Sequence, residues 1–200
     1  MKNICVYCGS SYGKQTVYAD AAKTLGEILV QNNIGLVYGG GHVGLMGIIA
    51  QTVFKNGGHV VGVIPKTLSD RELAYTELDD LRIVKNMHER KALMAELSDG
   101  FIAMPGGYGT LEEFFEAITW SQLAIHNKPC GLLNVQGFFN PLITFLDHTV
   151  EQGFVDQGNR DMILIDNAPE QLVNKMQNYS GMNVDKIEMA LQKTKERDLQ

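Results

Sequence analysis

FIAMPGGYGTLEE, residues 101–113, joins a short apolar run to a glycine-rich loop and then to the start of an amphipathic segment. The run 101–104 does not alternate with polar residues, which is typical of a strand that is buried on both faces. Residues 35–55 show the same order of strand, glycine loop and helix. In an α/β protein, ligands bind where such loops follow the carboxyl ends of parallel strands.

The rest of the chain repeats this alternation of short apolar runs and amphipathic segments. It predicts a doubly wound α/β domain over residues 1–180, in which helices cover both faces of a parallel sheet. The charged segment 181–200 is predicted to be either a tail or a docked helix. Strands are predicted over 4–8, 35–38, 59–64, 81–84, 101–104, 130–134 and 162–165, and helices over 16–31, 44–55, 86–97, 111–125, 140–151 and 169–177.

The composition excludes several classes of function. The chain has 200 residues and a formal net charge of −6, whereas binding of DNA or RNA depends on clustered Lys and Arg. No apolar run reaches the ~20 residues of a membrane span, and the N-terminus lacks a signal-peptide layout. Three cysteines (Cys5, Cys8 and Cys130) are too few for a disulfide framework, and we expect them to be reduced. We therefore expect a cytoplasmic protein that binds neither nucleic acid nor membrane.

The loop 39–47 matches the pattern G-x-G-x-x-G at Gly39, Gly41 and Gly44. A dinucleotide site also needs an acidic residue about 20 residues further on, and neither Asp nor Glu occurs between Gly39 and Ser69. The match therefore does not predict an NAD site. Two interpretations stay open. In the first, the glycines let a phosphate approach the helix N-terminus, and Gly41 is among the residues that contact the substrate. In the second, they permit a tight turn and close packing of helix and strand.

The loop 105–110 is a second candidate for binding a phosphate at a helix start. Gly106, Gly107 and Gly109 allow close approach of the backbone, and Ser10, which follows the first strand, is expected beside them. Tyr108 is expected to line the pocket, because its ring is apolar and its hydroxyl polar.

Thr110 and Glu113 have a spacing that allows two interpretations. One is a capping box, with Thr110 as the N-cap and Glu113 three residues later. The other is a carboxylate that the helix dipole holds ionised and that acts on a substrate. A third charged candidate is Arg90 in MHERK, residues 87–91. An Arg in the first turn opposes the helix dipole, which suggests a functional role; the alternative is a solvated surface side chain.

Together these motifs resemble the LOG family of cytokinin riboside 5′-monophosphate phosphoribohydrolases, long labelled lysine decarboxylases. The family pattern P-G-G-x-G-T-x-x-E matches residues 105–113, and M-H-x-R-K matches residues 87–91. The family's Gly-Ser turn resembles residues 6–10, and its Y-G-G-G-x-x-G-L-M-G resembles residues 38–47. The resemblance implies a Rossmann-like homodimer that hydrolyses the N-glycosidic bond of a nucleoside 5′-monophosphate. It implies Arg90 and Glu113 as the catalytic pair. The substrate contacts that it implies are Lys91, Glu72, Thr119 and the loop 107–110.

This activity is within the chemistry of the predicted residues. Cleavage of the bond builds positive charge on the ribose, and a carboxylate stabilises that charge while it aligns or deprotonates water. We expect this role for Glu113 and expect neither a metal nor an organic cofactor. We expect a prenylated adenine or adenine as the base, and the sequence does not determine which base is preferred. An alternative is a non-catalytic carrier of a nucleotide or of molybdenum cofactor, which would predict loss of the motif Glu or Arg. A decarboxylase is rejected, because it needs a pyridoxal phosphate lysine and a much larger chain.

Overall fold

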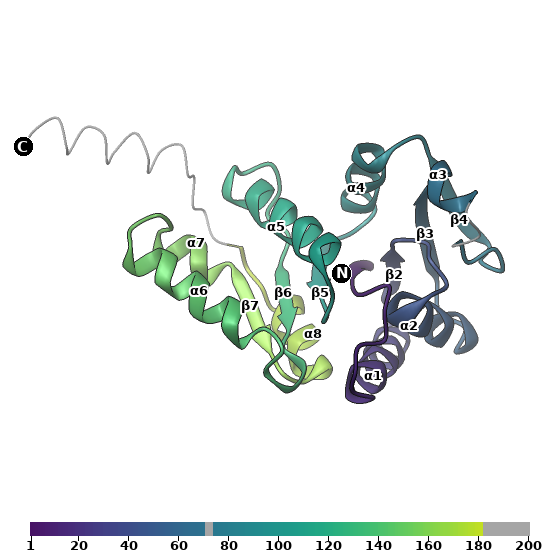
Figure 1. Cartoon of the computed structure of the whole chain (residues 1–200), viewed down its shortest axis with the longest axis horizontal. Coiled ribbons are helices and arrows are strands. Elements are labelled where there is room, and N and C mark those ends of the chain that lie inside the picture. The colour runs from purple at the N-terminus through teal and green to yellow at the C-terminus, as the bar shows by residue number, and fades with distance from the viewer. Residues whose placement is uncertain (71–73, 182–200) are drawn as a thin grey trace, which may run out of the picture.

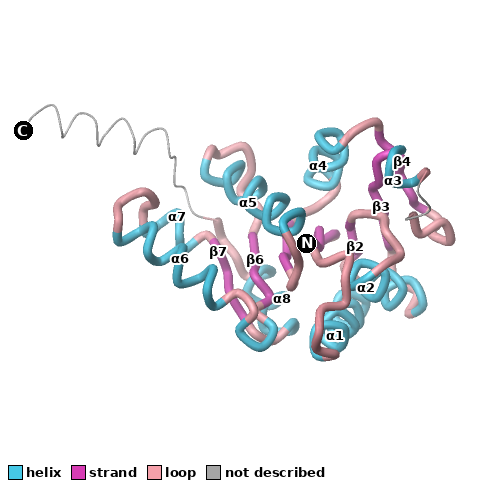
Figure 2. Tube along the Cα trace, in the orientation of Figure 1, coloured by secondary structure: helices cyan, strands magenta, loops and turns pink. Residues whose placement is uncertain are grey.

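The computed structural model describes residues 1–70 and 74–181. They form one parallel sheet in the order β4-β3-β2-β1-β5-β6-β7 (Figures 1 and 2). The chain begins at the centre of the sheet, builds outward from β1 to β4, and then returns to the other side of β1 to add β5, β6 and β7. The strands are β1 (Asn3–Tyr7), β2 (Gly35–Tyr38), β3 (Val60–Pro65), β4 (Asp80–Val84), β5 (Gly100–Ala103), β6 (Cys130–Leu133) and β7 (Ile163–Asp166).

Helices cover both faces of the sheet, as Figure 1 shows. One face is covered by α1 (Val17–Gln31), α2 (Gly44–Lys55) and α8 (Pro169–Gln177). The other face is covered by α4 (Met87–Glu96), α5 (Tyr108–Gln122) and α6 (Asn140–Glu151). The shorter helical segments are α3 (Lys66–Ser69), η1 (Val135–Gly137) and α7 (Gln157–Asp161).

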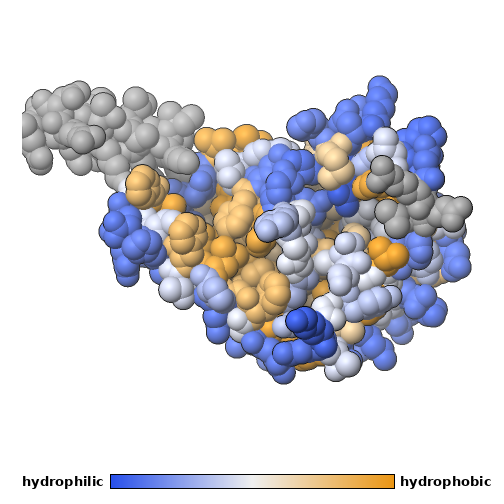
Figure 3. Space-filling model, in the orientation of Figure 1, coloured by the Kyte–Doolittle hydropathy of each residue, from blue (hydrophilic) through white to orange (hydrophobic). Residues whose placement is uncertain are grey.

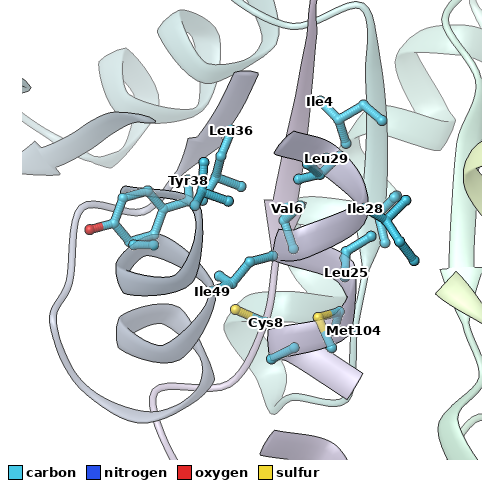
Figure 4. Close-up of a cluster of buried hydrophobic side chains, with 14 of the residues drawn as sticks. Ile4, Val6, Cys8, Leu25, Ile28, Leu29, Leu36, Tyr38, Ile49 and Met104 are labelled. Atoms are coloured by element: carbon cyan, nitrogen blue, oxygen red, sulfur yellow. The ribbon is translucent and has the colours of Figure 1, made fainter. Parts of the chain in front are cut away.

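The central strand β1 contributes to the apolar cores on both faces. Its Ile4 and Val6 belong to the core under α1 and α2, which Figure 4 shows, whereas Cys5 and Tyr7 belong to the core under α4 and α5. This division arises because successive strand side chains point to opposite faces. All four are buried, and burial of a large apolar side chain stabilises the fold by about 1.5–3 kcal/mol. The site is therefore built on a rigid, doubly covered sheet.

The two helices that carry the charged candidates begin differently. The Asn86 side chain caps α4 by accepting a hydrogen bond from the Glu89 amide at 2.9 Å, and the Glu89 carboxylate accepts one from the Lys85 amide at 2.9 Å. In contrast, α5 begins after Gly107 with no side-chain cap. Its first amides consequently remain available to a ligand.

The predicted fold class is confirmed, and most predicted elements lie within one or two residues of the observed ones. The helix predicted over 111–125 is observed over Tyr108–Gln122, and the short segments α3, η1 and α7 are not among the predicted elements. Most of the predicted tail lies outside the described residues. Within residues 1–70 and 74–181, no helix combines the length and apolar character that a membrane crossing requires.

Candidate active site

A cavity of about 510 Å³ lies where the strand order reverses between β1 and β5. The loops that follow these strands are joined, because the Gly9 amide donates a hydrogen bond to the Pro105 carbonyl at 3.1 Å. Side chains of Val43, Met46, Ile64 and Leu68 give the cavity an apolar part. The predicted site residues that line it are Ser10, Gly41, Arg90, Gly107, Tyr108, Gly109, Thr110 and Glu113.

A second hollow is larger, at about 640 Å³, and lies between α1 and the residues that follow β6. Asp20 is its one charged lining residue, and it contains neither glycine loop. The cavity between β1 and β5 is therefore the candidate active site, because it combines paired charges with a helix N-terminus.

Arg90 and Glu113 form a buried ion pair in this cavity. Arg90 Nη1 donates to Glu113 Oε1 at 2.8 Å, and each side chain is 10% exposed. Residues from α4 and α5, 23 positions apart, are thus brought into direct contact. The solvated surface arginine considered for Arg90 is excluded by this burial.

Two further nitrogens of Arg90 donate to main-chain carbonyls of β3 and of the residue after β2. Nε donates to the Val63 carbonyl of β3 at 3.0 Å, and Nη2 donates to the Gly39 carbonyl, just after β2, at 3.3 Å. A Cβ atom on Gly39 would lie 2.0 Å from Arg90 Nη2. Gly39 therefore provides both an acceptor and the space for the guanidinium. Val63 is not among the predicted site residues, because main-chain acceptors leave no signal in a sequence.

The position of Glu113 corrects the capping-box interpretation. Because Gly107 is the N-cap of α5, Thr110 lies inside the first turn and Glu113 in the second. Burial raises the pKa of the Glu113 carboxyl above its usual value, and the Arg90 guanidinium opposes that rise. Because Glu113 lies in the second turn rather than at the helix start, where the dipole acts, burial and the Arg90 guanidinium are the main influences on its charge.

The start of α5 has the properties of an anion site. The first amides of an uncapped helix are unpaired and lie at the positive end of its dipole. Methyl groups placed on Gly107 and Gly109 would meet no atom of residues 1–70 and 74–181 within 4 Å, so these residues leave open space beside the two glycines. Gly106 is different, because a Cβ there would lie 2.1 Å from Thr110 Oγ1. Tyr108 is 94% exposed at the mouth of the cavity.

The other glycine loop, residues 39–47, serves mainly for packing. Gly44 has a φ of +60° and a Cβ there would lie 2.2 Å from the backbone of Ser10. The Leu45 amide at the start of α2 donates to the Gly9 carbonyl at 3.0 Å, so a protein atom occupies this donor. Of the two interpretations left open for this loop, the structure favours the turn and close packing, although Gly41 lines the cavity.

Of the residues implied as substrate contacts, Lys91 and Thr119 are not among the lining residues of the cavity. The Lys91 ammonium group contacts the carboxylates of Glu112 and Glu116. Thr119 is exposed, and its hydroxyl donates to the Phe115 carbonyl at 2.7 Å. Glu72 lies outside the described residues.

Cys5, Cys8 and Cys130 are free and buried, as expected. Burial raises the pKa of the Cys5 and Cys8 thiols well above the usual value and that of Cys130 to about 12. These side chains are therefore neutral apolar groups rather than nucleophiles.

The chain is similar to several known proteins over most of its length. A family described as "Possible lysine decarboxylase" matches residues 46–176. The probable cytokinin riboside 5′-monophosphate phosphoribohydrolase LOGL2 of Oryza sativa subsp. japonica is 54% identical over 179 residues, which cover 90% of this chain and 73% of that protein. LOG3 of Arabidopsis thaliana, a cytokinin riboside 5′-monophosphate phosphoribohydrolase, is 54% identical over 90% of this chain and 83% of its own length.

Solved structures of more distant proteins share the fold. A molybdenum cofactor binding protein from Rippkaea orientalis has a TM-score of 0.66 and 20% identity, over 88% of this chain and 96% of that one. The molybdenum cofactor carrier protein of Chlamydomonas reinhardtii has a TM-score of 0.66 and 17% identity, over 89% and 97%. At such identities the likeness concerns the fold alone.

The doubly wound sheet and its buried arginine–glutamate pair define a Rossmann-like α/β protein with a ligand cavity at the switch point. Within that class, the chain belongs to the LOG family of cytokinin riboside 5′-monophosphate phosphoribohydrolases.

Proposed function

We propose that this protein hydrolyses the N-glycosidic bond of nucleoside 5′-monophosphates, with cytokinin riboside 5′-monophosphate or AMP as substrate and free base and ribose 5-phosphate as products. The observation that carries the proposal is the Glu113 carboxylate. Arg90 holds one of its oxygens inside a cavity that also contains an uncapped helix start. This arrangement joins a site for a sugar phosphate to a group that stabilises positive charge on the sugar.

The spacing along α5 suits a ribose 5-phosphate. Glu113 lies six residues after the N-cap Gly107, which corresponds to about 9 Å along the axis. Helical side chains lean toward the N-terminus, so the carboxylate lies closer than this to the first amides. The phosphate binds these amides, with Ser10 and Thr110 beside it, and the anomeric carbon lies next to Glu113. The base extends toward the apolar side chains of the cavity.

Arg90 acts mainly by orienting Glu113. Three of its nitrogens donate to protein acceptors, which are Val63, Gly39 and Glu113. Few donors then remain for a phosphate. The free oxygen of Glu113 stabilises the oxocarbenium-like ribose and aligns the attacking water. A protein that only carries a cofactor does not require a carboxylate oriented in this way. The orientation of Glu113 therefore favours hydrolysis over the carrier function.

Release of free base tests this proposal directly. We expect adenine from AMP or a prenylated adenine from its riboside 5′-monophosphate, measured by chromatography together with ribose 5-phosphate. The corresponding nucleosides without phosphate should react at least about 100-fold more slowly, because they lose the charge-assisted bonds to α5. If the nucleosides and nucleotides react equally well, the proposed phosphate site is wrong.

We also propose a homodimer that uses the α5–α6 face, which we define by Leu123 and Phe145. Both side chains are exposed, Phe145 by 61%. None of the residues of α6 is buried in the single chain although half of the helix is apolar. Figure 3 shows apolar side chains gathered over α5 and α6. Thr119 does not line the cavity of its own chain and lies on the exposed side of α5, near this face.

Light scattering of the purified chain tests the dimer. We expect twice the mass of one chain for the wild type and a single-chain mass for Phe145→Glu, because the new charge would be desolvated in the interface. Thr144→Glu is the matched control, since Thr144 lies on the polar side of the same helix and is exposed. It should remain dimeric. A dimer of unchanged mass in Phe145→Glu would exclude this face.

A further inference from the structure

A second ion cluster joins α4 to α5 directly beside the buried pair. Lys91 Nζ donates to Glu116 Oε1 at 3.0 Å and also to Glu112 Oε1. The Lys91 side chain is 10% exposed, whereas those of Glu112 and Glu116 are 55% and 27% exposed. Lys91 is thus a nearly buried cation, and two of its three N–H groups donate to carboxylates of the neighbouring helix.

The cluster is tied to the catalytic pair by the chain itself. Lys91 follows Arg90 on α4, and Glu112 precedes Glu113 on α5. Glu116 lies three residues after Glu113, which places it almost one turn further along the same helix. We call Lys91, Glu112 and Glu116 the outer cluster and Arg90 with Glu113 the inner pair. A change in the outer cluster therefore affects the inner pair, because it alters both the relative position of the two helices and the electric field at Glu113.

The charged groups around Glu113 come from α4 and α5. Arg90 and Lys91 of α4 favour its ionised form, while Glu112 and Glu116 of α5 oppose it. Cys5 and Tyr7 of β1, and Cys8 just after it, are neutral because burial raises the pKa of each. With Lys91 present the outer cluster has a net charge of −1, and without it the two carboxylates contribute −2.

We propose that Lys91 is a positioning residue that fixes α5 against α4 by holding Glu112 and Glu116. It thereby sets the lowest pH at which the Glu113 carboxylate remains charged and hydrolysis continues. The activity part rests on the proposed function, whereas the effect on Glu113 does not. This role differs from the substrate contact that the family resemblance implies for Lys91. The structure supports it because the ammonium group is engaged with α5 and is not among the cavity-lining residues.

Titration of the Glu113 side-chain carboxyl by carbon NMR, with the signal assigned from Glu113→Gln, tests the proposal without requiring catalysis. In Lys91→Met the uncompensated carboxylates disfavour a further negative charge, so the pKa of Glu113 should rise by about half a unit. The acidic limb of kcat should move to higher pH by the same amount while KM stays nearly constant. Lys91→Arg should behave as the wild type, and salt should reduce the shift because Glu112 is exposed.

The double variant Glu112→Gln/Glu116→Gln in the wild-type background provides an independent sign test. It leaves Lys91 as an unneutralised cation, so the pKa of Glu113 and the acidic limb should move to lower pH. This variant also serves if Lys91→Met does not fold. The positioning role is overturned if neither set of variants moves the titration, or if Lys91→Met raises KM with the limb unmoved, which indicates a substrate contact. An NMR shift in a protein that releases no base would instead refute only the proposed hydrolysis.

Discussion

Glu113→Gln is expected to lower kcat for base release by at least about 10³-fold, because the variant removes the negative charge that stabilises the oxocarbenium-like ribose. The size of the side chain is retained, and its amide oxygen can still accept from Arg90 Nη1, which now lies 2.8 Å from the carboxylate. Stopped assays of free base from AMP or a prenylated analogue give the rate.

Binding of the nucleotide should survive in this variant, since the proposed phosphate site consists of α5 amides rather than the carboxylate. Calorimetric titration with AMP should therefore give a dissociation constant within about threefold of the wild-type value, and circular dichroism should show an intact fold. Turnover at the wild-type rate would remove Glu113 from the mechanism. Loss of both binding and fold would show a structural role instead.

Gly39→Ala is expected to lower kcat by about 100-fold or more, the loss associated with a misplaced catalytic group. The added methyl group would lie 2.0 Å from Arg90 Nη2, and the guanidinium must leave its position to avoid it. Glu113 then loses the partner that orients it. The fold should tolerate the change, because the atom displaced is the end of a flexible side chain and the φ of Gly39 is not in the left-handed region.

Two comparisons separate this effect from general damage. Gly26→Ala adds the same methyl group in α1, at 3.0 Å from the Thr52 side chain and remote from the cavity. It should keep wild-type kcat. Arg90→Met should lower kcat as Gly39→Ala does, and combining the two changes should add little, because both act on one guanidinium. Additive losses in the double variant would mean that Gly39 does not act through Arg90.

The sheet was predictable because its strands are apolar on both faces and its helices are long enough to show a period. The bounds of β2 and α2 agree with the prediction, and α7, with five residues, is too short to give a periodic signal. The start of α5 was placed three residues late, since Gly107 and Gly109 are poor helix formers. The helix nevertheless begins at Tyr108, after a loop that is held to the end of β1 by the hydrogen bond from the Gly9 amide to the Pro105 carbonyl.

The site was predictable only in its motifs. The glycine loops and MHERK indicate which segments matter, but not that the first loop mainly packs and the second faces open space. The acceptors of Arg90 at Gly39 and Val63 are main-chain atoms from strands far away in sequence. The partners of Lys91 lie 21 and 25 residues away on another helix. Such pairings follow from helix packing and have no local pattern.

The bare start of α5 has a consequence for how such enzymes diverge. Amide groups belong to every residue except proline, so most point mutations in residues 108–110 leave the donors in place. The apolar wall of Val43, Met46, Ile64 and Leu68 consists instead of replaceable side chains. Drift in this lineage should therefore alter which purine is accepted, while recognition of the sugar ester persists unchanged.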